Sequence, residues 1–207
     1  LGSYTHTTGM LSPKRTTAYT YSGLTIPVSA ASNIPNSVSG SMSVTITQYK
    51  NSSSSETVGS SVTKRFKVTL KDDVVPTIST YSASLDNSSN TAVAAWGVGL
   101  VGYSKVKLFA SANGIYGSTI KSFSISGDYT ATVSGSSLNY IGNTISSSGN
   151  KSFTITCTDS RGRKSSAVTT DVISILQYTQ PKILSLSSVK EEYGDTNSLN
   201  DRMVVTA

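Results

Sequence analysis

A segment with strict alternation of apolar and polar residues constrains the fold more than any other feature of this sequence. Phe153, Ile155 and Cys157 alternate with threonines. A period of two places successive side chains on opposite faces of a β-strand, so that one set is buried and the other faces water. The sequence Asp-Ser-Arg-Gly at 159–162 then interrupts the strand with residues typical of tight turns. Residues 152–175 are therefore predicted to form an antiparallel hairpin in the core of a β-sandwich.

The returning strand of this hairpin has a less regular phase. It passes through Val168, Thr170 and Val172, but Ile173 and Ile175 fall on the opposite parity. A β-bulge inserts one residue and shifts the parity of everything that follows it. The pattern therefore predicts a bulge near Asp171 within a single strand.

Similar alternation recurs along the chain and indicates an all-β protein. Charged residues make up only 14% of the sequence, and Ser and Thr are frequent in every segment. This composition fits many short strands with hydroxyl-rich outer faces. Few windows show a helical period, and residues 27–36, with two prolines around a small-residue segment, are expected to hold one helical turn. The other expected strands cover 18–26, 41–49, 61–70, 74–85, 105–112, 120–126 and 129–133, with 91–95 opening the second region of the central repeat.

Two prolines divide the chain into units. Pro76 and Pro181 lie 105 positions apart, and each begins a Pro-x-Ile sequence that follows a hairpin. One Ig-like sandwich takes about 100 residues, and proline restricts both itself and the preceding residue. The spacing predicts tandem Ig-like β-sandwich domains joined by short, stiff, Pro-containing linkers. The expected division is 1–17 as a linker or the end of a preceding unit, 18–73 as a short first sandwich, 74–180 as an Ig-like sandwich, and 181–207 as the truncated start of a further unit.

Charge, cysteine content and hydropathy narrow the classes of function. The formal charge of +6 is spread along the chain without a run longer than two, unlike the clustered basic stripe of a nucleic-acid reader. The single cysteine, Cys157, excludes an intrachain disulfide, and no stretch approaches the ~20 apolar residues of a membrane span. We therefore expect neither nucleic acid nor a membrane as a partner. The chain begins without Met and ends within a strand-like sequence, so we expect it to be a piece of a longer protein.

Several sequences resemble a known family. GLVGYSKVK at 99–107, GIYGSTIKSF at 114–123 and TDSRGR at 158–163 resemble the Ig-like repeats of siphophage minor structural and tail host-recognition proteins, from phages of Gram-positive bacteria. TIP at 25–27 with IPNS at 34–37 resembles the repeat that precedes them. The resemblance implies an elongated, extracellular virion component near the tail tip or fibre, with other tail proteins as partners and no shared catalytic motif. Because the first unit is short and the third truncated, a receptor-binding head could lie outside this chain.

The sequence offers weak candidates for enzymatic chemistry. Residues 97–102 match G-x-G-x-x-G, but a dinucleotide site needs a helix after the glycines and an acidic residue about 20 positions on. Strand-like sequence follows instead, and the next carboxylate is Asp128. The only histidine, His6, lies in an aperiodic segment, and Cys157 has the inward parity of a buried thiol. We expect no enzymatic activity and no cofactor.

Paired carboxylates are better interpreted as solvated residues. Asp72-Asp73 lies at a joint and Glu191-Glu192 in the truncated unit, and neighbours on a strand point to opposite faces. A cation at the Asp72 joint, or among Asp195, Asn197 and Asp201, stays open, whereas zinc lacks ligands.

Three aromatic residues form the candidate ligand site. Trp96, Tyr103 and Tyr116 could stack on sugar rings, and the alternative is ordinary core and hairpin packing. The main hypothesis is a non-enzymatic structural or adhesive segment of a phage tail that spaces or presents a host-binding element. The alternatives are a carbohydrate-binding module for host cell-wall polysaccharide and a bacterial surface adhesin repeat. A homo-oligomer is compatible with each of them.

Overall fold

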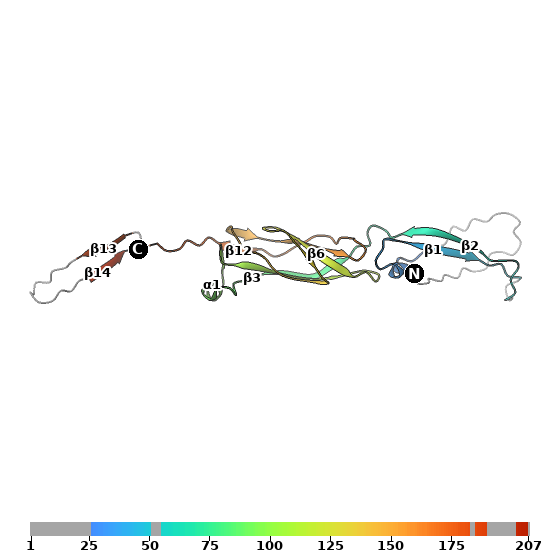
Figure 1. The fold of residues 1–207 in the computed structure, drawn as a ribbon, viewed down its shortest axis with the longest axis horizontal. Coiled ribbons are helices and arrows are strands. Elements are labelled where there is room, and N and C mark those ends of the chain that lie inside the picture. Colours follow the sequence, from blue (N-terminus) through green and yellow to red (C-terminus); the bar gives the residue numbers. More distant parts are fainter. Residues whose placement is uncertain (1–25, 51–54, 183–184, 190–201, 207) are drawn as a thin grey trace, which may run out of the picture.

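The computed structural model describes residues 26–50, 55–182, 185–189 and 202–206. Figure 1 shows a central β-sandwich with one β-hairpin on each side of it, all along one long axis. The expected linker at 1–17 and almost all of the expected strand at 18–26 lie outside the described residues.

The N-terminal unit consists of a short helix and a two-stranded sheet. The 3-10 helix η1 spans Val28–Asn33, and the strands β1, Ser39–Ile46, and β2, Val62–Thr69, pair antiparallel. The predicted helical turn and both predicted strands are therefore confirmed. Because the register pairs Met42 with Phe66, the apolar residues of both strands share one face.

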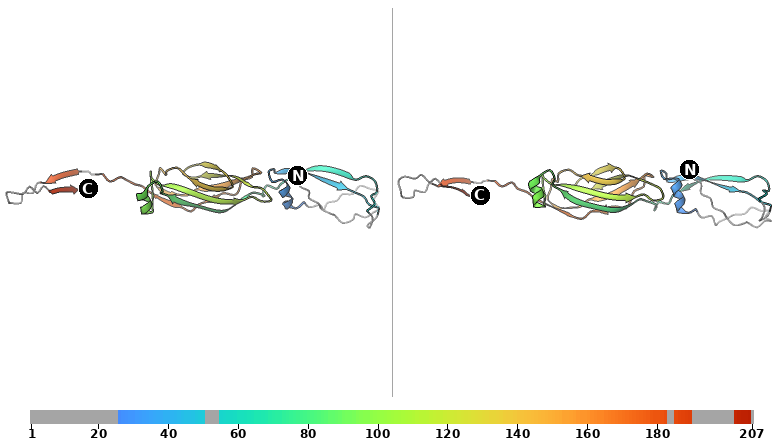
Figure 2. Two further views of the ribbon diagram at one scale, coloured as in Figure 1. Left: turned by 60° about the horizontal axis from the view of Figure 1, so that its bottom comes forward. Right: turned by 90° about the horizontal axis from the view of Figure 1, so that it is seen from below.

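The sandwich follows in residues 77–176. One sheet has the strand order β3-β5-β8 and the other β11-β10-β6-β7, while a third, small sheet has the order β4-β12-β9. Figure 2 shows the two larger sheets as stacked layers. The elements are β3 Thr77–Asp86, α1 Thr91–Trp96, β4 Gly99–Leu100, β5 Lys105–Asn113, β6 Ile120–Ser126, β7 Ala131–Ser134, β8 Ser137–Ile141, β9 Gly149–Lys151, β10 Thr154–Asp159, β11 Val168–Thr169 and β12 Ile173–Leu176.

The core of the sandwich lies between the two larger sheets. Alternate residues of β5 and β10 are buried, as their period of two predicted. Side chains of this kind from both sheets meet in one cluster, which is the arrangement of a face-to-face sandwich. Its fully buried members include Val106, Leu108, Phe123, Leu138, Phe153, Ile155 and Cys157.

The change of parity near Asp171 has a different cause from the predicted bulge. Val168 and Thr169 pair with β10, whereas Ile173–Leu176 pair with β9 and with β4. The chain therefore leaves one sheet and joins another at this point. The new parity places Ile175 in the core from the small third sheet.

Residues 91–96 form the helix α1, where the sequence was expected only to open the second region of the central repeat. The side chain of Asn90 caps the helix by accepting a hydrogen bond from the amide of Val93 at 3.1 Å. Three alanines favour the helix, and Gly97 ends it in the left-handed conformation, with φ of 67°.

No sheet of the described residues has strands from both sides of Pro76 or of Pro181. A further hairpin, β13 Ser185–Val189 and β14 Arg202–Thr206, follows Pro181.

Candidate functional site at the first joint

The contact between the N-terminal unit and the sandwich is the most elaborate polar arrangement in the described residues. We call it the first joint. From the sandwich, it contains the turn at 115–118, between β5 and β6, and the turn at 159–163, after β10. From the N-terminal unit, it contains η1 with Ile34 and Pro35, and residues 70–72, which directly follow β2.

Asp159 forms the turn that presents the joint residues. One carboxylate oxygen, Oδ1, accepts hydrogen bonds from the amides of Arg161 and Arg163, both at 2.9 Å. Gly162 between them has φ of 79°, a conformation that glycine adopts without strain. Asp159 is only 2% exposed, so the turn is fixed from inside the protein. The result is a rigid loop with two arginines pointing out of the end of the sandwich.

Arg161 connects the two units through its guanidinium group. Nε and Nη2 donate to the carbonyls of Ile34 and Ala31, at 3.1 and 2.9 Å, in the N-terminal unit. Nη1 and Nη2 donate to the carbonyls of Ile115, at 2.7 Å, and Tyr116 in the sandwich. The side chain is buried, with the whole residue 8% exposed. The fixed fork of donors in arginine suits such a set of carbonyls, which a lysine could not satisfy together.

Two neighbours of Arg161 extend the contact. The Ser160 hydroxyl donates to the carbonyl of Pro35 and accepts from the amide of Thr119. Arg163 donates from Nη1 to the carbonyl of Lys71 at 2.6 Å. Its Nη2 donates to the carbonyl of Leu70 at 3.0 Å and reaches the carboxylate of Asp72 at 3.3 Å. The carboxylate considered for a cation is thus paired with an arginine.

The covalent connection also packs inside the joint. Val74 and Pro76 are buried, so the linking segment lies against the units. Main-chain carbonyls, guanidinium groups and a serine hydroxyl carry no nucleophile with an adjacent base. This arrangement holds two units in one orientation and offers no catalytic chemistry.

The second joint, residues 177–182, has a different character. All of its residues except Tyr178 are exposed. Among the described residues, this stretch forms one hydrogen bond, from the side-chain amide of Gln177 to the carbonyl of Tyr178. The Tyr178 ring contacts Tyr103 edge-on, at 5.4 Å between centroids. Thus the two joints, which the Pro-x-Ile pattern suggested were equivalent, differ in structure.

The three candidate glycan-binding residues do not share one surface. Trp96 ends α1 and is 57% exposed, and Tyr103 precedes β5 and is 39% exposed. Tyr116 lies beyond the other end of β5, at the first joint, and its carbonyl accepts from Arg161. The nine residues of β5 separate Tyr116 from the other two by about 30 Å of extended chain.

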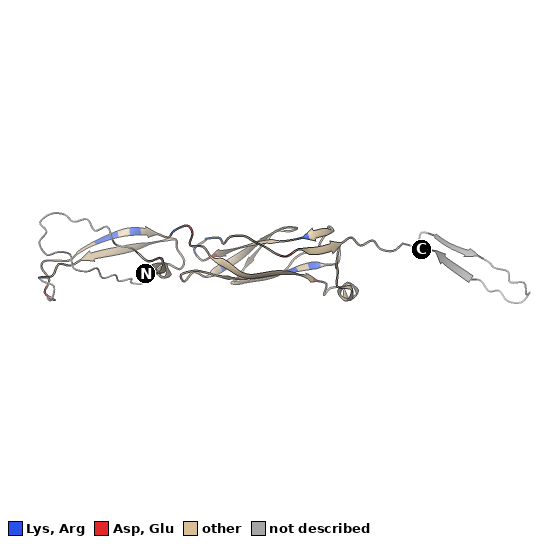
Figure 3. Ribbon diagram, turned by 180° about the vertical axis from the view of Figure 1, so that it is seen from behind, with Lys and Arg blue, Asp and Glu red and all other residues tan. Residues whose placement is uncertain are grey.

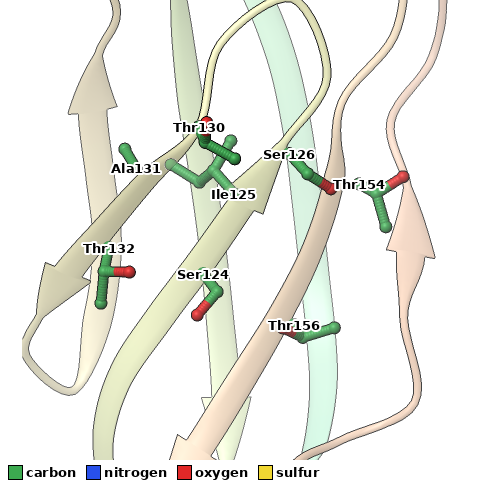
Figure 4. Close-up of a pocket in the computed structure, with 8 residues that line it drawn as sticks. All are labelled: Ser124, Ile125, Ser126, Thr130, Ala131, Thr132, Thr154 and Thr156. Atoms are coloured by element: carbon green, nitrogen blue, oxygen red, sulfur yellow. The ribbon is translucent and has the colours of Figure 1, made fainter.

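A shallow hollow of about 430 Å³ lies over β6, β7 and β10. Figure 4 shows that hydroxyl-bearing side chains from these three strands surround it. Serine and threonine hydroxyls without a base can form hydrogen bonds but do not form a catalytic pair. Its lining residues are Ser124, Ile125, Ser126, Thr130, Ala131, Thr132, Thr154 and Thr156.

None of the other residues considered for chemistry in the sequence lies in a reactive site among the described residues. Cys157 is fully buried, and burial raises the pKa of its thiol, which keeps it in the unreactive protonated form. Gly97 ends α1, and no helix begins after Gly102, because β5 follows. His6, Glu191 and Glu192 lie outside the described residues, as do Asp195, Asn197 and Asp201.

The described residues contain neither a metal-binding cluster nor a membrane-spanning helix. No group of three or more His, Cys, Asp or Glu side chains in this part of the chain could hold a metal ion. No helix among the same residues has the length and apolar character needed to cross a bilayer.

Sequence reasoning missed the arginines of the first joint. Arg161 and Arg163 were interpreted only as part of a turn motif. A signal was present, since two arginines flank a glycine at the end of a predicted core strand, where charge is seldom placed without a partner. Apart from the carboxylate of Asp72, however, the partners of their side chains are main-chain carbonyls, which no sequence pattern reports.

One family of known proteins matches nearly the whole chain. The family described as "Siphovirus protein of unknown function" matches residues 3–203. The chain belongs to this siphovirus family. This membership supports a phage structural protein associated with the virion. It agrees with the siphophage origin that the sequence motifs implied. No curated protein and no solved structure matches the chain.

Proposed function

We propose that this siphovirus protein is a non-enzymatic structural or adhesive segment of the phage tail that spaces or presents a host-binding element. It would act outside the host cell, with other tail proteins as partners. The first joint is the observation that carries this proposal. A spacer must hold neighbouring units in a fixed relative position. The single side chain of Arg161 donates hydrogen bonds to carbonyls of both units.

Burial makes this joint strong. Hydrogen bonds to charged groups contribute about 1.5–3 kcal/mol each, and a guanidinium hidden from water is poorly screened by salt. Val74 and Pro76 are buried, which restricts the movement of the connecting chain. With the orientation fixed in this way, the two units form a rigid rod, whereas a flexible linker would let them move independently.

The strand order supports Ig-like units. In an Ig-like sandwich the third, sixth and seventh strands form one sheet, and the first, second and fifth strands lie in the other. With the short strands β4 and β9 of the third sheet left out, the first, second and fifth strands of the sandwich are β3, β5 and β8, which share one sheet. The third, sixth and seventh are then β6, β10 and β11, which share the other. The chain enters this sandwich at Thr77 and leaves it at Leu176, at the opposite end, which suits a tandem array.

Localisation on the particle tests the proposal. An antibody raised against the full chain and coupled to gold is expected to label the tail of intact phage in electron micrographs. Pre-incubation of the antibody with the purified chain provides the control and should abolish the labelling. Labelling confined to the capsid, or a purified particle without this chain in its proteome, would overturn the tail assignment.

A further inference from the structure

The hairpin of the N-terminal unit has a polar face that the spacer role does not use. Each threonine or serine of β1 on this face lies opposite a residue of β2 whose side chain is on the same face. Ser43 pairs with Arg65, and Ser41 pairs with Lys67. All of these side chains are exposed. We call this surface the basic face, formed by Ser41, Ser43, Thr45, Thr63, Arg65, Lys67 and Thr69.

The basic face lies in a strongly positive part of the chain. Residues 26–71 contain five Lys or Arg and one acidic residue, Glu56, whose carboxylate pairs with Lys50 at 3.1 Å. Arg65 and Lys67 form neither an ion pair nor a hydrogen bond with any part of the chain that the structure describes. Figure 3 shows the basic residues following one another along β2. Two exposed cations therefore have no partner within the described part of the chain.

The spacing of these cations restricts the ligand. Residues i and i+2 of a strand lie about 6.7 Å apart on the same face. Successive charges along an extended phosphodiester backbone have a comparable separation. Arginine binds phosphate oxygens bidentately, and lysine binds them as a point charge.

The hydroxyls around the cations favour one kind of phosphodiester polymer. Thr45 and Thr63 already bond each other at 2.8 Å, which fixes their positions. Ser41 and Ser43 stand beside the cations with free donor capacity for a polyol or a phosphate. The face contains no aromatic side chain, whereas proteins that bind single-stranded nucleic acid stack bases on aromatic rings.

We propose that the basic face binds a base-free phosphodiester polymer, such as a polyol-phosphate chain, lying along β2. Arg65 and Lys67 contact successive phosphates, and the hydroxyls of β1 contact the polyol between them. This inference goes beyond the spacer role, since it assigns a ligand to the N-terminal unit itself. It also uses a surface separate from the aromatic residues Trp96, Tyr103 and Tyr116.

Neighbouring residues of β2 provide a matched pair of variants. Arg65→Glu and Lys64→Glu each replace one exposed cation by a carboxylate, but Lys64 pairs with Val44 and lies on the opposite face. Binding of the full chain to a synthetic glycerol-phosphate oligomer is measured by calorimetry over a range of salt concentrations. We expect Arg65→Glu and Lys67→Glu each to weaken binding at least tenfold, and Lys64→Glu to change it less than twofold.

The salt dependence gives a second readout. By analogy with single-stranded nucleic acid, each lost phosphate contact should reduce the slope of log affinity against log salt by about 0.7. Arg65→Gln and Lys67→Gln replace the charge-reversed variants if either of those fails to fold.

Three results would overturn the proposal. The first is no binding of the oligomer at millimolar concentration. The second is equal weakening by Lys64→Glu and Arg65→Glu, which would indicate net charge alone. The third is tighter binding of an oligothymidylate with the same number of phosphates, which would indicate a nucleic-acid surface.

Discussion

At the scale of single residues, Tyr129 links the stability of the sandwich to alkaline pH. Its ring packs against Phe153, at 4.8 Å between centroids, and its hydroxyl donates to the carbonyl of Val106 at 3.4 Å. Burial raises the pKa of Tyr129 to about 12, from an ordinary value of 10.0. The folded state therefore holds the phenol proton more tightly than the unfolded state does.

The sign of the pH effect follows from this raised pKa. Below pH 10 the phenol is protonated in both states, and the stabilisation is fully present. As the pH rises from about 10 to about 12, the unfolded chain loses the proton first, so stability decreases. We expect chemical denaturation to show a flatter alkaline decline for Tyr129→Phe than for the wild type. Identical pH profiles for both proteins would contradict this account.

Single residues also show how far sequence reasoning reaches. The burial of Phe153, Ile155 and Cys157 could be predicted because strand geometry fixes the direction of alternate side chains. The role of Arg161 could not, because its partners Ala31 and Ile34 lie 130 and 127 positions away. Nothing local to an arginine records a partner so distant in the chain.

At the scale of elements, the turn after β10 controls the short helix of the preceding unit. The carbonyl of Ala31 in η1 accepts both from the amide of Ile34, at 2.9 Å, and from Arg161. A six-residue helix is marginal by itself and depends on such tertiary contacts.

Removing the guanidinium should therefore release η1. Arg161→Ala deletes four charge-assisted hydrogen bonds, and we expect local stability to fall by about 3 kcal/mol after partial rehydration. Hydrogen exchange at the amide of Ile34 should then accelerate by about 100-fold. Lys164→Ala, at the exposed residue directly after the same turn, should leave this rate unchanged. An unchanged rate in Arg161→Ala would contradict the assigned role.

Elements were easier to predict than their pairing. Strands with a clear period of two, such as β5 and β6, were found within one or two residues. The exchange of sheets near Asp171 was interpreted as a bulge because parity reports alternation and not the identity of the neighbouring strand. The helix α1 was missed because six residues are too few to show a helical period. The three aromatic candidates were grouped by residue type, which contains no information about the two ends of β5.

At the scale of the whole molecule, the two joints predict different sensitivity to proteases. Each has a lysine at which trypsin can cut, Lys71 in the first joint and Lys182 at the end of the second. The carbonyl of Lys71 is held by Arg163 at 2.6 Å, whereas Lys182 lies in an exposed segment. Because a protease needs a locally unfolded backbone, we expect cleavage after Lys182 well before cleavage after Lys71.

A variant of the first joint sharpens this test. Arg163→Ala should accelerate cleavage after Lys71 and leave cleavage after Lys182 unchanged, as followed by mass spectrometry of the fragments. Earlier cleavage after Lys71 than after Lys182 in the wild type would refute the difference between the joints. The sequence alone suggested equal joints, since the proline punctuation is the same and the partners come from distant turns.

The path of the chain through the sandwich has a mechanical consequence. The polypeptide enters beside Thr77 at the first joint and leaves beside Leu176 at the opposite end, near Val101. A pull on the two ends therefore acts parallel to β3, so the hydrogen bonds between β3 and β5 are loaded together in shear and do not open one at a time. Strong tension along a particle would thus meet a unit that yields abruptly and only at high force.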